Sequence, residues 1–260
     1  MNRHVAACQF EPAIGNVEEN LEAIRTIGGD CSDDVTVAIF PELCVTGYDL
    51  EIVPDLATVV PGPITDSLVE IAADLECSLV VGLPEHDGEE LFNTMAVVSE
   101  DGLEATYRKQ YPWGEEADVF TPGTEPTTVE TPVGTVGLCC CYDLNFPEVG
   151  LEYAHLGCDV LAVNAAWRTS YLSDWRLLSR ARARDGPFYV VASNHTGEQH
   201  GREHAGHSLI VGPDGRIQSE ANDTRGVVTA PVEVSSLERA HQRNPVRATR
   251  SSMDSWFCTR

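Results

Sequence analysis

Lysine is almost absent from this sequence. Of its 17 basic residues only one, Lys109, is a lysine, whereas 41 residues are acidic and the formal net charge is −24. A surface this negative argues against nucleic acid and anionic membranes as partners. Because the acidic residues are spread along the chain, we expect a surface suited to high salt, where counterions screen the repulsion between carboxylates.

Long hydrophobic runs are also missing. No apolar stretch approaches the roughly 18 residues that a membrane-spanning helix needs, and the opening segment MNRHVAACQFEP is too weakly apolar for a secretory signal. The nine cysteines are irregularly spaced and form no CxxC pair, a pattern typical of thiols in a reducing compartment. We therefore predict a cytoplasmic protein with no membrane contact and no cysteine-based metal site.

Strand and helix patterns alternate without repeats or linkers, which predicts one domain over residues 1–260. Buried strands are expected at 4–10, 35–42, 78–85, 135–143, 159–165 and 188–194, and helices at 16–28, 64–77, 147–157 and 173–185. Hairpin turns are expected at Asp101-Gly102 and around 212–215. The pattern leaves open whether there is one sheet or two. The polar segment from about 237 reads as a C-terminal extension that packs on a partner subunit.

Three reactive side chains fall at the ends of predicted strands. Glu42 ends VTVAIFPE, Lys109 follows ATYR, and Cys141 ends TVGLCCC. Strand ends are where α/β proteins gather reactive groups, although each residue taken alone is usually a cap, a surface charge or a small core residue. Lys109 stands out because arginine has replaced lysine everywhere else, and arginine cannot replace a compact ammonium with a tunable pKa.

Three consecutive cysteines precede the turn Tyr142-Asp143. In a strand, Cys139 and Cys141 face one side and Cys140 the other. A nucleophile must be reachable and activated, so we expect Cys141, at the junction of strand and turn, to be the reactive thiol. Cys139 and Cys140 are expected to pack in the core.

The segments around these residues resemble the three signature segments of the nitrilase, or carbon–nitrogen hydrolase, superfamily. They are FPELCVTGYD around Glu42, YRKQYPWGEEADVFTPG around Lys109 and GLCCCYDLNFPE around Cys141, in that order. Supporting segments such as ACQFEPAIGNVEENL, LAVNAAW and GHSLIVGPDGR extend the resemblance over nearly all of residues 4–233. It implies an α/β (α+β) fold, a four-layer α-β-β-α sandwich, in a homodimer or larger homo-oligomer.

The resemblance also implies a Glu-Lys-Cys triad that needs no cofactor. Glu42 would be the general base, Lys109 the stabiliser of the oxyanion and Cys141 the nucleophile, with Glu116, rather than Glu115, as the second glutamate. The Tyr142 backbone N–H is a second donor that meets the charge on the oxyanion. Glu42 can serve both halves of the reaction if burial keeps its pKa near the working pH.

The substrate is expected to be a small amide. In true nitrilases the cysteine is typically followed by Trp-Glu, whereas Tyr142-Asp143 here resembles the amidase and carbamoylase branches. Trp167 and Arg168 follow a predicted strand, where they would line the pocket, and Arg168 would pair with a substrate carboxylate, as an N-carbamoyl amino acid or an ω-amide acid requires. Arg168 pairing with a surface acid is an equally good explanation. Weaker pocket candidates are Trp113, Tyr48 and Asn164.

Three competing functions remain at this point. A metal hydrolase would use the histidines of HTGEQHGREHAGH, at positions 195, 200, 204 and 207, but their spacing fits no HExxH helix and glycines make the segment a loop. A Cys-His hydrolase with His155 as base leaves Lys109 unexplained. A non-catalytic scaffold of the same fold would be free to lose one of the three reactive residues, and this chain has all three.

Overall fold

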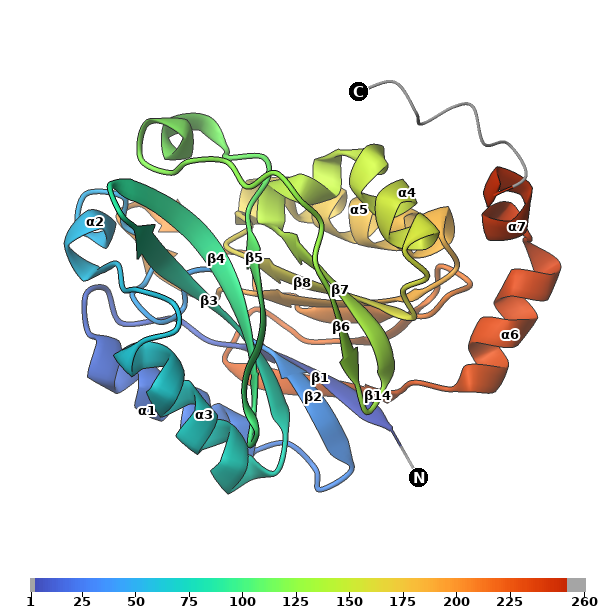
Figure 1. The fold of residues 1–260 in the computed structure, drawn as a ribbon, viewed down its shortest axis with the longest axis horizontal. Helices are drawn as coiled ribbons and strands as arrows, with labels where there is room; N and C mark the ends of the chain where they lie inside the picture. Colours follow the sequence, from blue (N-terminus) through green and yellow to red (C-terminus); the bar gives the residue numbers. More distant parts are fainter. Residues whose placement is uncertain (1–2, 252–260) are drawn as a thin grey trace.

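The computed structural model describes residues 3–251, which form two mixed β-sheets packed face to face between two layers of helices (Figure 1). The first sheet has the strand order β14 (Gly226–Pro231), β1 (His4–Gln9), β2 (Val35–Ile39), β3 (Ser78–Asp87), β4 (Glu90–Ser99) and β5 (Gly102–Arg108). The second has the order β13 (Ile217–Glu220), β12 (Leu209–Val211), β9 (Tyr189–Asn194), β8 (Val160–Ala165), β7 (Gly134–Cys140) and β6 (Thr128–Thr131).

Helices cover the outer face of each sheet. Helices α1 (Val17–Gly29) and α3 (Pro63–Leu75) lie side by side on the first sheet, and α4 (Pro147–His155) and α5 (Leu172–Asp185) lie on the second (Figure 1). This is the expected four-layer α-β-β-α sandwich. The strands form two sheets, a point that the sequence pattern had left open. No helix within residues 3–251 has the length and apolar composition to cross a bilayer.

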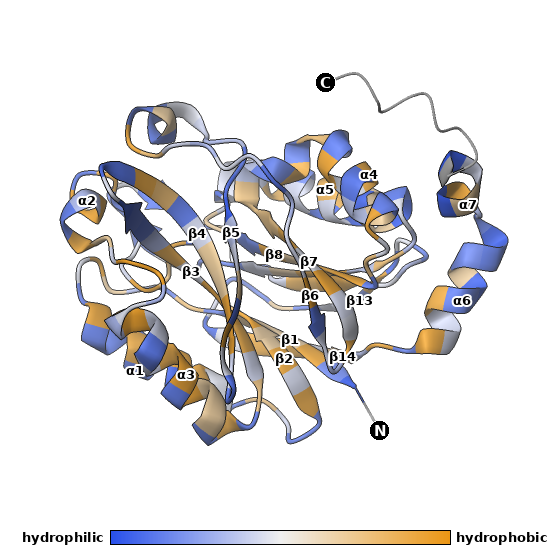
Figure 2. Ribbon diagram, in the orientation of Figure 1, coloured by the Kyte–Doolittle hydropathy of each residue, from blue (hydrophilic) through white to orange (hydrophobic). Residues whose placement is uncertain are grey.

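The apolar core follows the alternation of side chains along each strand. In β1, Val5 and Ala7 point between the two sheets, whereas Ala6 and Cys8 point toward α1 and α3. The same alternation in the second sheet separates the central core from a third apolar cluster under α4 and α5. Both faces of the central strands are therefore apolar, as expected for strands that are covered on both sides, and these strands are coloured as largely hydrophobic in Figure 2.

Local signals set the helix boundaries. The Asn16 side chain accepts a hydrogen bond from the Glu19 backbone N–H at 3.2 Å and caps α1. Pro63 and Pro147 occupy the first positions of α3 and α4, where a missing N–H costs nothing. The short elements α2 (Val53–Leu56), β10 (Glu198–Gln199) and β11 (Arg202–Glu203) lie in loops.

The C-terminal helices α6 (Val234–Arg243) and α7 (Val246–Ser251) follow the edge of the sandwich (Figure 1). The expected start of an extension, about residue 237, falls inside α6, and Leu237 packs in the core between the sheets. In α7, Arg247 Nε donates to the Gly186 carbonyl at 2.6 Å and Arg250 Nη1 donates to the Asp185 carbonyl at 2.8 Å. The described part of this segment therefore contacts its own chain, and contact with a partner subunit stays a prediction.

Candidate active site

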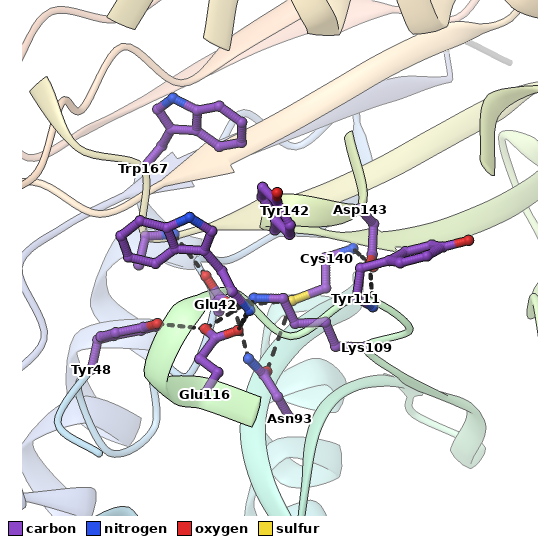
Figure 3. A network of polar contacts seen from close by, with 12 residues as sticks. Glu42, Tyr48, Asn93, Lys109, Tyr111, Glu116, Cys140, Tyr142, Asp143 and Trp167 are labelled. Carbon is purple, nitrogen blue, oxygen red and sulfur yellow. Dashed lines mark hydrogen bonds and ion pairs between the residues drawn. The ribbon is translucent and has the colours of Figure 1, made fainter. Parts of the chain in front are cut away.

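Lys109 lies at the centre of the buried polar cluster between the two sheets. Its Nζ donates to Glu42 Oε1 and to Glu116 Oε2, both at 2.7 Å (Figure 3). The lysine side chain is 2 % exposed and the two glutamates are equally inaccessible. An ammonium and two carboxylates that are so deeply buried stabilise one another only as a group, because each alone would carry a large desolvation cost.

Glu42 lies in the turn after β2, three residues beyond the end of that strand. Its Oε1 also accepts a hydrogen bond from Asn93 Nδ2 at 2.8 Å, and its Oε2 accepts one from the Ala166 backbone N–H at 3.0 Å. Burial alone would raise the pKa of Glu42, but the charge of Lys109 and the hydrogen bonds hold it below the ordinary value. In the resting site the pKa of Glu42 is therefore lower than expected, and the carboxylate is ionised and able to accept a proton.

The pKa of Lys109 is shifted in the opposite direction to that of Glu42. Burial favours its neutral form, but the negative charges of Glu42 and Glu116 raise the pKa of the ammonium well above its usual range. Glu116 is held in turn by the Trp113 backbone N–H at 2.7 Å and by the Tyr48 hydroxyl. This lysine is therefore a fixed positive charge.

Cys141 is not the last residue of its strand. Strand β7 ends at Cys140, and Cys141 begins the 3₁₀ helix η2 (Cys141–Asn145) with a φ of +48°. A cysteine in this left-handed region costs about 1–3 kcal/mol, and such strain gathers at functional sites. The alternation rule for side chains therefore does not extend to Cys141, whose thiol faces the pocket while Cys139 packs under the helices.

Cys140 has more than a packing role. Its Sγ lies 3.3 Å from Glu42 Oε1, in addition to packing between the sheets. The pKa of the Cys141 thiol is raised well above its usual range by burial and by the charge of Glu42, which outweigh Lys109. The resting site thus contains an uncharged thiol beside an ionised carboxylate.

Asp143 joins the segments that carry Lys109 and Cys141. Its carboxylate accepts hydrogen bonds from the Cys140 and Tyr111 backbone N–H groups, both at 2.9 Å, and from the Tyr107 hydroxyl at 2.7 Å. Burial raises the pKa of Asp143 to about 6.

A pocket with a volume of about 210 Å³ opens above this cluster. Of the residues expected from the sequence, its wall contains Glu42, Glu116, Cys141, Tyr142, Trp167, Arg168, Trp113 and Tyr48. Lys109 lies beneath, in contact with two of them. Glu115 instead forms an exposed ion pair with Arg202 at 3.2 Å.

Two other expected residues lie outside the pocket wall. Asn164 is fully buried in β8, where neither polar atom of its amide has a hydrogen-bond partner among the described residues. His155 is exposed at the end of α4. Within residues 3–251, no group of three His, Cys, Asp or Glu side chains is arranged to hold a metal ion.

The sequence reasoning missed several residues of the site. Asn93 and Cys140 contact Glu42, and the pocket wall also contains Arg202, His204, Asn145, Tyr171 and Asp174. Asn93 lies in the segment LFNT, which has no titratable side chain, and the sequence suggested His204 only as one of four possible metal ligands in the histidine-rich loop.

Comparison with known proteins defines the class to which this fold and cluster belong. Residues 4–242 match the sequence model of the family described as Carbon-nitrogen hydrolase. Since this is most of the chain, the protein belongs to the carbon–nitrogen hydrolase family and is a hydrolase of carbon–nitrogen bonds.

Similar individual proteins include omega-amidases and amidases. The human protein named Omega-amidase NIT2 is 32% identical over 231 residues, which cover 84% of each chain. Among solved structures, Saccharomyces cerevisiae Nit3, described as a member of branch 10 of the nitrilase superfamily, has a TM-score of 0.89 at 26% identity and covers 94% of this chain and 95% of its own. An amidase from Nesterenkonia sp. has a TM-score of 0.84, also at 26% identity, and the match covers 94% of this chain and 96% of the amidase chain.

Proposed function

We propose that this protein is a thiol hydrolase of a small linear amide that carries a carboxylate at its far end. The observation that carries the proposal is Arg168, whose guanidinium lines the pocket above Cys141 and stacks on the Trp113 ring at 4.6 Å. Among the described residues it meets no carboxylate, although the protein has 41 acidic residues. An unpaired guanidinium in a pocket suits a substrate carboxylate.

The first half of the reaction forms a thioester. The Cys141 sulfur attacks the amide carbonyl while the thiol proton moves to the Glu42 carboxylate. Negative charge develops on the carbonyl oxygen, where the Lys109 ammonium and the Tyr142 backbone N–H stabilise it, each donor contributing about 3 kcal/mol. The carbon–nitrogen bond then breaks as Glu42 returns the proton to nitrogen, and ammonia or an amine leaves.

The second half regenerates the enzyme. Glu42 takes a proton from water as the water oxygen attacks the thioester carbon, and the proton goes to the departing sulfur. The lowered pKa of Glu42 and the raised pKa of Cys141 mean that a free thiolate does not form in advance. Transfer of the proton therefore accompanies formation of the sulfur–carbon bond.

Glu116 positions the other two residues of the cluster. It accepts from Lys109 and from the Trp113 backbone, so it fixes the ammonium beside Glu42 and also orders the pocket wall under Arg168. Trp167 contributes an apolar surface, since its indole N–H is already engaged by the Tyr171 carbonyl at 2.9 Å.

An ω-amide of a dicarboxylic acid and an N-carbamoyl amino acid both satisfy this site, since each has a carboxylate at one end and an NH₂-bearing carbonyl at the other. The name of the human relative favours the ω-amide. The N-carbamoyl amino acid is the second candidate, because Arg168 serves it equally. We further propose a cytoplasmic homodimer or larger homo-oligomer, supported by the exposed apolar side chains Leu156 and Leu177 on the outer helical layer.

The test is ammonia release in high KCl from a dicarboxylic acid monoamide, an N-carbamoyl amino acid, a neutral amide and a nitrile. We expect turnover of one of the first two, and loss of at least roughly 10³-fold in Cys141→Ala. The matched control is Cys139→Ala, the neighbouring thiol on the far side of the sheet. Activity that survives in Cys141→Ala, or a preference for the neutral amide, would contradict the proposal.

A further inference from the structure

The histidine-rich loop between β9 and β12 directs its four side chains to different places. His200 is 62% exposed and pairs with Asp49 at 2.8 Å, and His207 Nδ1 lies 3.1 Å from Glu220 Oε1. His195 is fully buried, and its Nε2 lies 2.5 Å from the backbone carbonyl oxygen of Glu42. Three of the four rings therefore have partners within the chain, and His195 helps to fix the segment that carries the general base.

His204 is the histidine that faces the pocket. The residue is 4 % exposed, it lines the pocket, and neither of its ring nitrogens has a hydrogen-bond partner among residues 3–251. The Ala166 backbone is near the ring but outside hydrogen-bonding geometry. A buried polar group without a partner costs free energy, so a ligand that supplies the missing partner gains affinity.

The neighbour of His204 on the pocket wall is Arg168. The two residues form an isolated antiparallel bridge, and residues that lie directly opposite in such a bridge point to the same side. The unpaired guanidinium and the unpartnered imidazole therefore extend from the same side of the bridge, and both residues line the pocket. On the other side, the His204 ring packs against His195 with 5.0 Å between ring centroids, which limits its movement.

The imidazole of His204 is neutral. Burial lowers its pKa to about 3, and the neighbouring His195 and Arg168 act in the same direction. A neutral imidazole offers one N–H donor and one acceptor, so it adds a directional hydrogen bond to the wall without adding charge.

We propose that His204 is a specificity-determining residue that donates a hydrogen bond to the substrate carboxylate beside Arg168. This inference rests on the proposed function, because it requires a carboxylate at that end of the substrate. The guanidinium attracts any anion over a broad range of positions. The single imidazole N–H, held by its packing on His195, selects an anion whose oxygen reaches one point, and it thereby discriminates between anionic amides of different length.

The test compares kcat and KM for a dicarboxylic acid monoamide and for a neutral amide of the same length. In His204→Phe, which keeps a ring but removes both nitrogens, we expect kcat/KM for the anionic amide to fall about 10- to 100-fold, mainly through KM. The neutral amide should change by less than about 3-fold. His204→Gln restores an N–H donor and should recover part of the loss, and His200→Phe, from the exposed part of the same loop, is the matched control.

The outcomes separate the two proposals. If the wild type shows no preference for the anionic amide, the proposed carboxylate recognition is wrong, and the role of His204 is wrong with it. If the wild type has that preference and His204→Phe keeps it, or loses activity equally on both substrates, only the role of His204 is overturned. A melting temperature for each variant identifies any loss of activity that comes from misfolding. If His204→Phe does not fold, His204→Gln tests the role of His204, because it restores an N–H donor and should keep part of the preference for the anionic amide.

Discussion

At the scale of single residues, the charge balance around Lys109 links stability to chemistry. Removing the ammonium in Lys109→Met leaves Glu42 and Glu116 buried with no countercharge, and we expect a loss of about 3–5 kcal/mol in the free energy of unfolding together with loss of activity. Adding Glu116→Gln removes one of the two charges and should recover part of the stability without restoring activity. Denaturant titration measures both.

An exposed ion pair provides the control. Arg25 and Asp74 pair on the surface, so Arg25→Met should cost less than about 1 kcal/mol. If Lys109→Met costs no more than Arg25→Met, the buried cluster does not depend on its ammonium.

Asp143 predicts a pH dependence of stability. In the folded protein its pKa is raised from 3.8 to about 6, so the folded state holds this proton more tightly than the unfolded state does. The resulting stabilisation is fully present below pH 3.8 and is lost as the pH rises through 6, an effect of up to about 3 kcal/mol. We expect the difference in unfolding free energy between the wild type and Asp143→Asn to change by that amount between pH 4 and 7, and a constant difference would contradict the assignment.

Single residues also show how far the sequence alone could lead. The expected pocket residues Glu116, Trp167 and Arg168 were recognisable because they stand at fixed distances from recognisable segments. Asn93, which contacts Glu42, and His204, which lines the pocket, were not recognisable, because they come from segments that are distant in sequence and only the packing of the two sheets brings them to the site. The left-handed backbone of Cys141 was also unpredictable, since no glycine marks it.

At the scale of elements, helix α7 ties the ends of two others together. Arg247 donates to the carbonyl of Gly186, which follows α5, and to that of Cys158, which follows α4. We expect Arg247→Ala to lower the free energy of unfolding by about 1–3 kcal/mol, because two buried carbonyls lose a charged donor. Arg243→Ala, at an exposed position in α6, is the control, and equal melting temperatures for the two variants would contradict this role of α7.

Elements with strong local signals were predictable, and those without them were not. Helices α1, α3 and α4 begin at the caps or prolines that mark them. Strands β6 and β14 lie at sheet edges, where only one neighbour pairs with them and the alternation of apolar residues is weak. Strand β2 ends at Ile39, so the polar end of the predicted run is a turn that places Glu42 over Lys109.

At the scale of the whole molecule, the net charge of −24 predicts stability that depends on salt. Repulsion among the carboxylates weakens when counterions shorten the screening length from about 30 Å at 0.01 M to about 3 Å at 1 M. We expect the melting temperature to rise by at least about 5 °C from low to molar KCl, equivalent to about 2 kcal/mol. Sucrose, which stabilises without screening, is the control, and an equal rise in sucrose alone would contradict the electrostatic explanation.

The burial of the only lysine has a practical consequence for labelling. Amine-reactive dyes, cross-linkers and surface-coupling reagents modify side-chain ammonium groups that solvent can reach, and Lys109 offers none in the folded state. In the unfolded chain the same amine is free. Incorporation of one such label into the side chain at position 109 therefore counts the molecules whose two sheets have separated, so the native sequence contains its own reporter of unfolding.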